Sequence, residues 1–496
     1  MLRAFFVLAL AAAVALADPC PKCGQDVEKK WKFCPDCGQT LPDRDRIARE
    51  AALQAEEKKG ELLVAMRRLK RAYEDAGDKE RAAQVAEAIN RIEGSPVAGG
   101  ADPALPGGAK PVEGYRDRVE FRAQLLEGGG GTAETEAAVL SGLKWLARHQ
   151  SADGSWSSQG FHARCAGKSC MGAGEEDYPA ALTGLAILGF LGAGYTPQST
   201  ESWRDPQSGD EVSPGAVVRR GLTWLVRSQD AQGCIGSRMT ARYMYSHAIG
   251  TMAMAEAAGM TGAESYLASA RLAVDYLVSA QNPGRGWRYS ARDGESDMSV
   301  TTWCVLALRA AARAGIDVPR ESLAGAKAFV VEVTDEAYCK VGYNSKGTGK
   351  VVVPGKNDDW DDHPTMTAGG ILCRMIAGAD RTDPALDGGA KLLVCDLPAY
   401  AGKKVDYYYW HYGTMALHRF NAPDGKYWKA WVEALKNALV PAQRTGKNGC
   451  LEGSWDADVD RWGYEAGRVY VTALNTLTLE TWYRDAKAPE KKPKRK

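Results

Sequence analysis

The stretch LKWLARHQSADGSW, residues 143–156, decides the fold. Its first half is amphipathic and ends at Gln150, and its second half is a loop that contains Gly154 and Trp156. Related stretches, in which a helix again leads through a glutamine into a loop with glycine or tryptophan, recur at residues 222–233, 274–287 and 435–455. The recurrence predicts a chain built from repeated helix-and-corner units.

A second kind of segment, apolar nearly all round, alternates with these amphipathic helices. These segments cover residues 180–193, 248–258, 301–314, 367–379, 412–420 and 471–482. A helix without a polar face must be buried on every side, and an inner ring surrounded by amphipathic helices meets that demand. Weaker outer partners are expected at residues 323–333 and 386–394. With no strand-like alternation between them, residues 113–484 are predicted to form an all-α double ring with six inner helices.

Composition and charge exclude several functional classes. The 496 residues carry 63 basic and 62 acidic side chains, so the net charge of +1 gives no electrostatic basis for binding nucleic acid. A chain with 45% hydrophobic and 25% charged residues is typical of globular proteins. The large rings mostly carry a polar edge, because 14 tryptophans and 20 tyrosines stand against 8 phenylalanines.

The amino-terminal segment predicts export. An apolar run, Ala4 to Ala17, follows Arg3 and ends in small residues, which is the order of a secretory signal peptide over residues 1–17. The alternative is a buried helix. This run is too short to cross a bilayer, and no later apolar segment is longer, so we expect an exported protein of the periplasm or extracellular space without a transmembrane segment.

Cysteines form two groups. Cys20, Cys23, Cys34 and Cys37 lie in two Cys-x-x-Cys knuckles, which predict a structural zinc ribbon over residues 18–42. An oxidising compartment could convert the same thiols into disulfides. The other eight cysteines are scattered. Cys165 and Cys170, in a Gly-rich loop, could form a local disulfide, and the pairing of these eight is left open.

Four further predictions complete the chain. Residues 43–94 predict a helical hairpin of the coiled-coil or tetratricopeptide type, and residues 95–112 are a Gly- and Pro-rich linker. Residues 485–496 are a basic tail that we expect to be disordered, with weak contact to an anionic surface. The ribbon and hairpin would dock to an envelope protein that the sequence does not identify.

Residues 150–156 also resemble a known motif. They fit the Q-x-x-x-G-x-W repeat of squalene–hopene and oxidosqualene cyclases, and the repeat pattern is similar to that of protein prenyltransferase β-subunits. Residues 406–414, 453–456 and 467–474 resemble more closely the exported bacterial prenyltransferase/squalene oxidase repeat proteins, whose activity is unassigned. This resemblance implies an (α/α)6 toroid of the terpenoid cyclase type over residues 113–484.

An acidic run at residues 357–364 is the sharpest catalytic candidate. Asp359-x-Asp361-Asp362 matches the D-x-D-D motif of class II terpene cyclases, and the resemblance implies that Asp361 is the acid that protonates an alkene. The same run fits the D-D-x-x-D pattern of class I enzymes if it is read from Asp358. A solvated acidic loop before a helix that starts at Pro364 is the alternative.

Other chemistry-bearing residues are expected at one mouth of the ring, where the amino-terminal ends of the inner helices would gather. They are Asp177, His247, Asp297, His363, Asp406, Tyr408, Trp410, His411 and Tyr470. Carboxylates there are expected as helix caps even without catalysis, and histidines as hydrogen-bonded core residues. A prenyltransferase zinc site is incomplete, because Ser299 stands where the resemblance would place a thiolate.

Three functions remain open on these grounds. The first is a binding or scaffold protein of the cell envelope, the second is a terpenoid cyclase or prenyltransferase-like enzyme, and the third is a carbohydrate-active toroid with an acid and a base at its mouth. Zinc in the ribbon is the only cofactor that the sequence predicts.

Overall fold

The computed structural model describes residues 129–165, 170–205, 207–446 and 449–484, together with Arg81, Val112, Tyr115 and Leu126. The chain divides into two compact units, Met1–Pro103 and Ala104–Lys496. The predicted signal peptide, zinc ribbon and basic tail lie outside the described residues, as do the hairpin and linker except for Arg81 and Val112.

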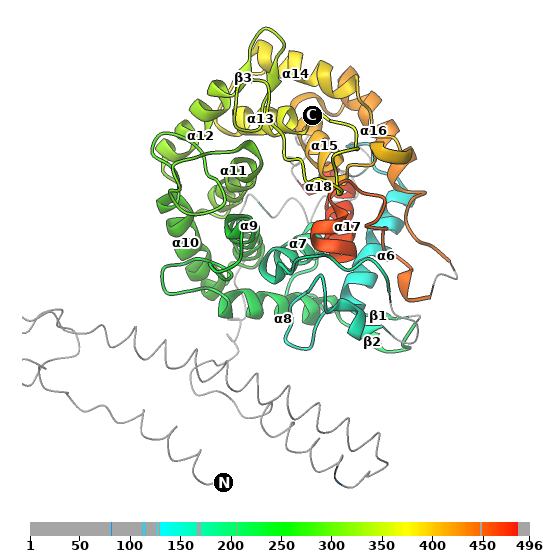
Figure 1. Ribbon diagram of the computed structural model, residues 1–496. Coiled ribbons are helices and arrows are strands. Elements are labelled where there is room, and N and C mark those ends of the chain that lie inside the picture. The colour runs from blue at the N-terminus through cyan, green and yellow to red at the C-terminus, as the bar shows by residue number, and fades with distance from the viewer. Residues whose placement is uncertain are drawn as a thin grey trace, which may run out of the picture. The chain divides into compact units, whose positions relative to one another are not determined.

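Within the described part of the second unit, two concentric rings of helices alternate along the chain (Figure 1). The inner helices are α7 (Pro179–Gly192), α9 (Tyr243–Thr261), α11 (Met298–Arg313), α13 (Thr365–Ile376), α15 (Tyr407–Asn421) and α17 (Gly463–Leu479). The outer helices are α6 (Ala133–Arg148), α8 (Pro214–Arg227), α10 (Glu264–Ser279), α12 (Arg320–Glu332), α14 (Pro384–Val394) and α16 (Lys426–Leu439). Each inner helix contacts the next, and α17 returns to contact α7, so the ring closes. The predicted all-α (α/α)6 toroid is confirmed.

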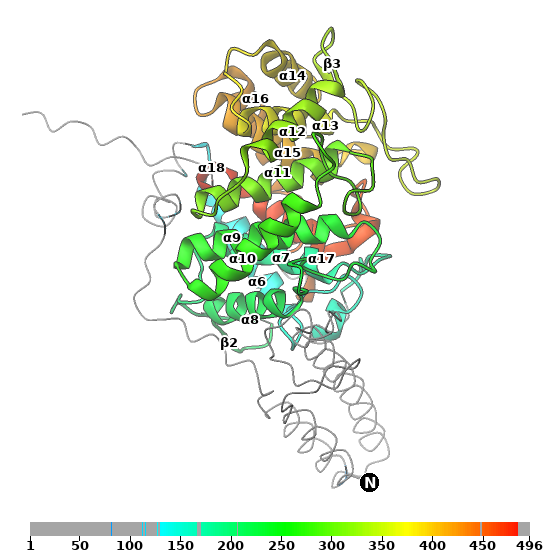
Figure 2. The same cartoon turned by 90° about the vertical axis from the view of Figure 1, so that its left-hand side faces the viewer.

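Burial explains which helix lies inside. Residues Ala180 to Gly192 of α7 are all buried, as its continuous apolar sequence requires. Helix α8 buries one face through Val217, Leu222 and Leu225, whereas its arginines are exposed. Figure 2 shows the double wall from the side, where the outer helices α8, α10 and α12 follow one another around the ring.

The glutamine of each corner joins neighbouring repeats. Gln150 Nε2 donates to Gly154 O at 2.9 Å, within its own corner, and to Val217 O at 3.0 Å, in the next outer helix. Trp156 Nε1 donates back to Leu146 O at 2.8 Å. Gly154 has φ +97°, and a Cβ there would lie 2.4 Å from Arg220 O, so only glycine fits the corner.

The same bonds recur at the other three corners, even where the motif is imperfect. The pairs of carbonyl acceptors are Gly233 and Ser269 for Gln229, Arg285 and Ser322 for Gln281, and Gly453 and Ala138 for Gln443. The bond from Gln443 Nε2 to Ala138 O, at 2.8 Å, joins the last repeat to helix α6 of the first. The glutamine therefore has a physical role that does not depend on the tryptophan.

Two features differ from the sequence expectation. Short antiparallel pairs, β1 (Trp203–Arg204) with β2 (Glu211–Val212) and β3 (Thr334–Asp335) with β4 (Lys340–Val341), lie in the connections. Several inner helices also begin earlier than predicted. Helix α15 starts at Tyr407 and not at Tyr412, because its polar first turn is largely buried and Asp406 caps it.

The remaining short elements are η1 (Phe161–Arg164), η2 (Gly402–Lys404), η3 (Gly449–Leu451) and α18 (Thr481–Arg484). Among the described residues, none of the helices combines the length and the apolar character needed to cross a membrane.

Candidate functional site

A cavity of about 480 Å³ lies among the amino-terminal ends of the inner helices. All six inner helices or the residues just before them contribute to its wall, and so do strand β4 and the segment that follows it, up to Val351. Leu182, Leu185, Ile249 and Trp303 supply apolar surface. The centre of the toroid is therefore not filled by side chains, and a small molecule with an apolar body has room there.

Tyrosine hydroxyl groups form a network on one side of this cavity. Tyr245 donates to Ser299 Oγ at 2.7 Å, and the same oxygen lies 2.7 Å from the hydroxyl of Tyr408. Tyr408 in turn donates to Tyr412 at 3.3 Å. Burial raises the pKa of Tyr245 and of Tyr408, so both hydroxyls stay protonated at neutral pH. The network can donate or accept hydrogen bonds without carrying a charge.

Asp406 is a buried carboxyl group that lines the cavity. It is 1% exposed and caps helix α15, where Oδ1 accepts the backbone N–H of Tyr409 at 2.8 Å. Burial raises the pKa of Asp406, although the nearby charges of His363 and Arg461 oppose the rise. Asp460 is buried beside it, and burial together with the charge of Asp406 raises the pKa of Asp460 as well. Two neighbouring carboxyl groups thus have raised proton affinity, and of the two Asp406 lines the cavity.

His363 lies on the same part of the wall. Its Nδ1 is 2.6 Å from Asp396 Oδ2, its ring stacks on Tyr409 at 4.9 Å, and its Nε2 is buried without a hydrogen-bond partner in the structure. Burial lowers the pKa of His363, but the hydrogen bond to Asp396 and the charge of Asp406 outweigh it, so the net shift is upward. His363 and Asp406 are the cavity's candidate proton donors.

Asp297 lies behind the cavity wall and is not part of its lining. Its Oδ1 caps helix α11 by accepting the N–H of Val300 at 2.9 Å, and its Oδ2 is buried without a hydrogen bond. Arg288 Nε is 3.9 Å from Oδ2. Burial raises the pKa of Asp297 to about 7, against the opposing effects of the Val300 N–H and Arg288.

The acidic run at residues 359–362 is mostly turned to solvent. Asp359, Asp361 and Asp362 are all exposed, and of these three only Asp362 lines the cavity. Asp359 pairs with Lys403 at 3.0 Å, and Asp362 pairs with Arg461 at 3.6 Å. The match to the cyclase motif therefore falls on a loop in which Asp361 is exposed to solvent.

The other predicted mouth residues have separate places. Tyr470 lines the cavity, and Trp410 is buried against Tyr407 in the core. Asp177 accepts hydrogen bonds from Ser157 and Ser158 and fixes the loop before α7.

Two predicted histidines are core residues. His247 Nδ1 accepts the N–H of Ile235 at 3.1 Å, and His411 Nδ1 lies 3.0 Å from Thr478 Oγ1. Burial lowers the pKa of each to about 3. His411 lines a second cavity of about 30 Å³ with Trp303, whereas His247 lines neither of these cavities.

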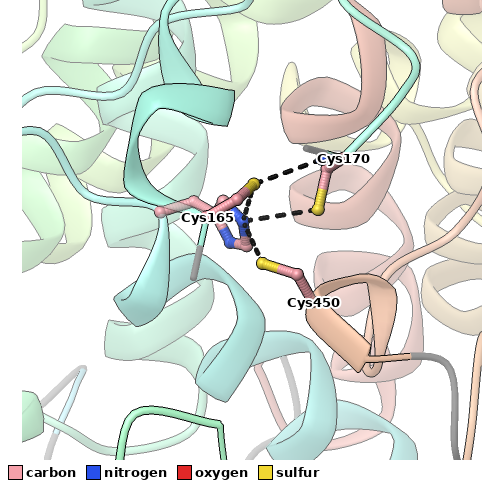
Figure 3. A group of neighbouring side chains, drawn as sticks. Cys165, Cys170 and Cys450 are labelled. Atoms are coloured by element: carbon pink, nitrogen blue, oxygen red, sulfur yellow. Dashed lines mark hydrogen bonds between the residues drawn. The ribbon is translucent and has the colours of Figure 1, made fainter. Parts of the chain in front are cut away.

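The sequence reasoning missed a group of residues at the outer edge of the toroid. Cys165 and Cys170 do not form the local disulfide that the sequence allowed: both are free thiols that gather with Cys450 (Figure 3) and His149 into a group that could hold a metal ion. The only sequence signals were a histidine just before Gln150 and a cysteine just before the Gly453 corner, 301 positions apart.

A comparison with protein families finds a match within the toroid. The family Squalene-hopene cyclase C-terminal domain matches residues 207–336. No curated protein sequence gives a significant match.

Solved structures at low identity include three that cover most of this chain. A protein from Actinoplanes is 17% identical, with 70% of this chain and 99% of that chain covered and a TM-score of 0.40. The type II terpene cyclase MstE from Scytonema is 11% identical, with coverages of 71% and 97% and a TM-score of 0.43. An alpha-amylase from Clostridium perfringens is 10% identical, with coverages of 70% and 97% and a TM-score of 0.41. The described part of the chain is thus a closed (α/α)6 toroid, and residues 207–336 within it resemble the squalene-hopene cyclase C-terminal domain.

Proposed function

We propose that the toroid binds an apolar small molecule of isoprenoid size in its central cavity. The observation that carries this proposal is the cavity of about 480 Å³ among the inner helices, whose largely apolar wall also carries hydroxyl groups and charged side chains such as Arg242, Asp406 and Glu465. A ligand with one polar group would place its chain against Leu185, Ile249 and Trp303 and its polar end near Ser299. A scaffold function alone would need no such space.

The test is a binding measurement with geranylgeraniol as the probe. Native mass spectrometry of the full chain should detect a one-to-one complex. Ala181 lines the cavity, so Ala181→Trp fills it and should weaken binding by at least about tenfold. Leu272→Trp places the same side chain on the outer wall, where Leu272 is 49% exposed, and should bind like the wild type. Equal binding by all three proteins would overturn the proposal.

A second candidate function, acid-catalysed cyclisation of the bound isoprenoid, is favoured by one further observation. Asp406 is a buried carboxyl group on the cavity wall, and its raised pKa favours the protonated form that such an acid must have. Asp406, and not the exposed Asp361, would then deliver the proton. The aromatic wall would stabilise the resulting cation.

Gas chromatography of squalene or geranylgeraniol incubated with the protein tests this candidate. Asp406→Asn should abolish product formation, and Asp361→Asn should retain it. If turnover is lost in Asp361→Asn but kept in Asp406→Asn, the proton donor is Asp361 of the D-x-D-D motif and not Asp406. Binding without any product in the wild type would reject cyclisation and leave the binding function in place.

We propose further that the protein is exported and works at the cell envelope, with a zinc ribbon over residues 18–42 as a docking module. The apolar run at residues 4–17 and the two Cys-x-x-Cys knuckles support this. Amino-terminal sequencing of protein isolated from its own envelope should begin at Asp18. An intact amino terminus in a cytoplasmic fraction would contradict export.

A further inference from the structure

One histidine and three cysteines lie together at the outer edge of the toroid, away from the cavity. This group, called here the histidine–cysteine cluster, consists of His149, Cys165, Cys170 and Cys450. We propose that the cluster binds one zinc ion as a closed structural site that fastens the last repeat to the first. The proposal is independent of what the central cavity binds.

The distances within the cluster fit a tetrahedral zinc shell. His149 Nε2 lies 3.5 Å from the sulfur of Cys165, 3.6 Å from that of Cys170 and 3.3 Å from that of Cys450. Zinc bonds of about 2.0 Å to nitrogen and 2.3 Å to sulfur, at tetrahedral angles, place nitrogen and sulfur about 3.5 Å apart. All four ligand atoms lie within 4.8 Å of one another, and Figure 3 shows the three sulfurs converging.

The surroundings orient the histidine as a ligand. His149 Nδ1 is 2.8 Å from the carbonyl oxygen of Trp145. Because a carbonyl oxygen can only accept a hydrogen bond, the ring proton must be on Nδ1. The lone pair of Nε2 is then free to bind a metal and faces the sulfurs. The ring stacks on Trp145 at 4.1 Å, with Phe161 at 5.7 Å on an edge. The N–H of Cys170 donates to the sulfur of Cys165 at 3.2 Å, a bond that stabilises a metal-bound thiolate.

The elements that carry the ligands explain what the ion would do. His149 follows α6, Cys165 and Cys170 precede α7, and Cys450 lies in η3, after the last outer helix α16. The site therefore crosses the closure of the ring, where Arg148 also donates to Glu452 O at 2.8 Å. Four protein ligands leave no open position, so the ion is structural and takes no part in catalysis.

Burial favours zinc over a solvent-exposed reactive thiol cluster. His149 is fully buried, and Cys170 and Cys450 are 6% and 9% exposed. Three thiolates and one imidazole in a tetrahedral arrangement are a donor set that zinc prefers among the divalent metals. Without a metal, three thiols and an imidazole would be packed together away from water with few hydrogen bonds to satisfy them.

The first experiment compares metal content and stability in full-length proteins. Inductively coupled plasma mass spectrometry should show that Cys450→Ser contains about one zinc ion fewer per chain than the wild type. Its melting temperature should fall, because the first and last repeats lose a cross-link. Cys234→Ala is the matched control, since Cys234 is fully buried but outside the cluster, and it should keep the wild-type zinc content.

A second measurement does not depend on Cys450→Ser folding. In Cys34→Ser, which breaks the predicted ribbon, X-ray absorption at the zinc edge should report three sulfur ligands and one nitrogen ligand. Three results would each overturn the proposal: no zinc in this variant, a shell without sulfur, or a mass deficit of about 2 Da per bond that maps a disulfide to cysteines of the cluster.

Discussion

The acidic run at residues 359–362 and the helix-capping residue Asp406 both lie near the mouth of the ring. Their acidic side chains all end in carboxyl groups, but they differ in burial. Asp361, in the acidic run, is exposed, and Arg461 donates to its backbone carbonyl. Asp406 lies near the same arginine, but it is buried as the cap of α15. The match to the D-x-D-D motif indicated Asp361 as the acid, whereas it is the pKa of Asp406 that burial raises. Proton affinity in a protein is set by the surroundings of a carboxyl group, which a short motif does not contain.

The largest effect expected from this comparison concerns Asp297, the other buried capping acid. Its pKa is about 7 in the folded protein, against 3.8 as the ordinary value, so the folded state keeps a proton that the unfolded chain releases between pH 4 and pH 7. The stability that this proton contributes is complete below pH 4 and is lost as the pH rises through 7. Asp297→Asn keeps the cap and stays neutral, so at pH 8 it should be more stable than the wild type by of the order of 4 kcal/mol.

Urea unfolding of both proteins at several pH values measures that difference. The comparison with the variant is needed because two other buried groups also change the stability of the protein with pH. His247 and His411 have pKa values lowered to about 3, so both proteins become less stable as the pH falls below the ordinary histidine value of 6.5. Their contribution cancels between the two proteins. A gap between wild type and Asp297→Asn that is the same at pH 4 and pH 8 would show that Asp297 does not hold its proton.

The second expected effect is the loss of a helix cap. Asp406→Ala removes the acceptor for the N–H of Tyr409 and should destabilise the protein by about 1 kcal/mol, with a range of 0.5–2. Asp406→Asn keeps an acceptor oxygen, so it should cost less. Thermal unfolding at one pH compares the stability of the two variants. Equal losses of stability would mean that Asp406 stabilises the protein through its charge and not through the helix cap.

The smallest effect is expected in the acidic run. Asp361→Asn changes an exposed side chain outside the cavity lining, so stability should change by less than about 0.5 kcal/mol, and binding of geranylgeraniol should not change. Calorimetry of the variant beside Asp406→Ala checks both. A loss as large as that of Asp406→Ala would place Asp361 in the structural or binding machinery after all.

The double ring could be predicted from the sequence because its cause is local. Segments such as residues 180–193 have no polar face, and that property alone requires burial on all sides. The corner glutamines were visible too, but their bonds to the next outer helix, such as Gln150 to Val217, needed coordinates. The start of helix α15 was placed too late because its first turn is polar, although Tyr407 and Tyr409 are buried there.

The site was harder to predict because it depends on distance and burial. Asp406, Tyr408, His363 and Tyr470 were expected at the mouth, and the structure places all four on the cavity wall. Which acid would be buried could not be read from the order of residues. The histidine–cysteine cluster was missed because its members come from both ends of the repeat array, and only ring closure brings them together.

The most direct test of the central claim is a crystal structure of the full chain with geranylgeraniol. The account predicts density for the isoprenoid chain inside the toroid, against Leu185, Ile249 and Trp303, with its hydroxyl group near Ser299 or Asp406. Density confined to the outer surface, or a cavity closed by rearranged tyrosines, would contradict it.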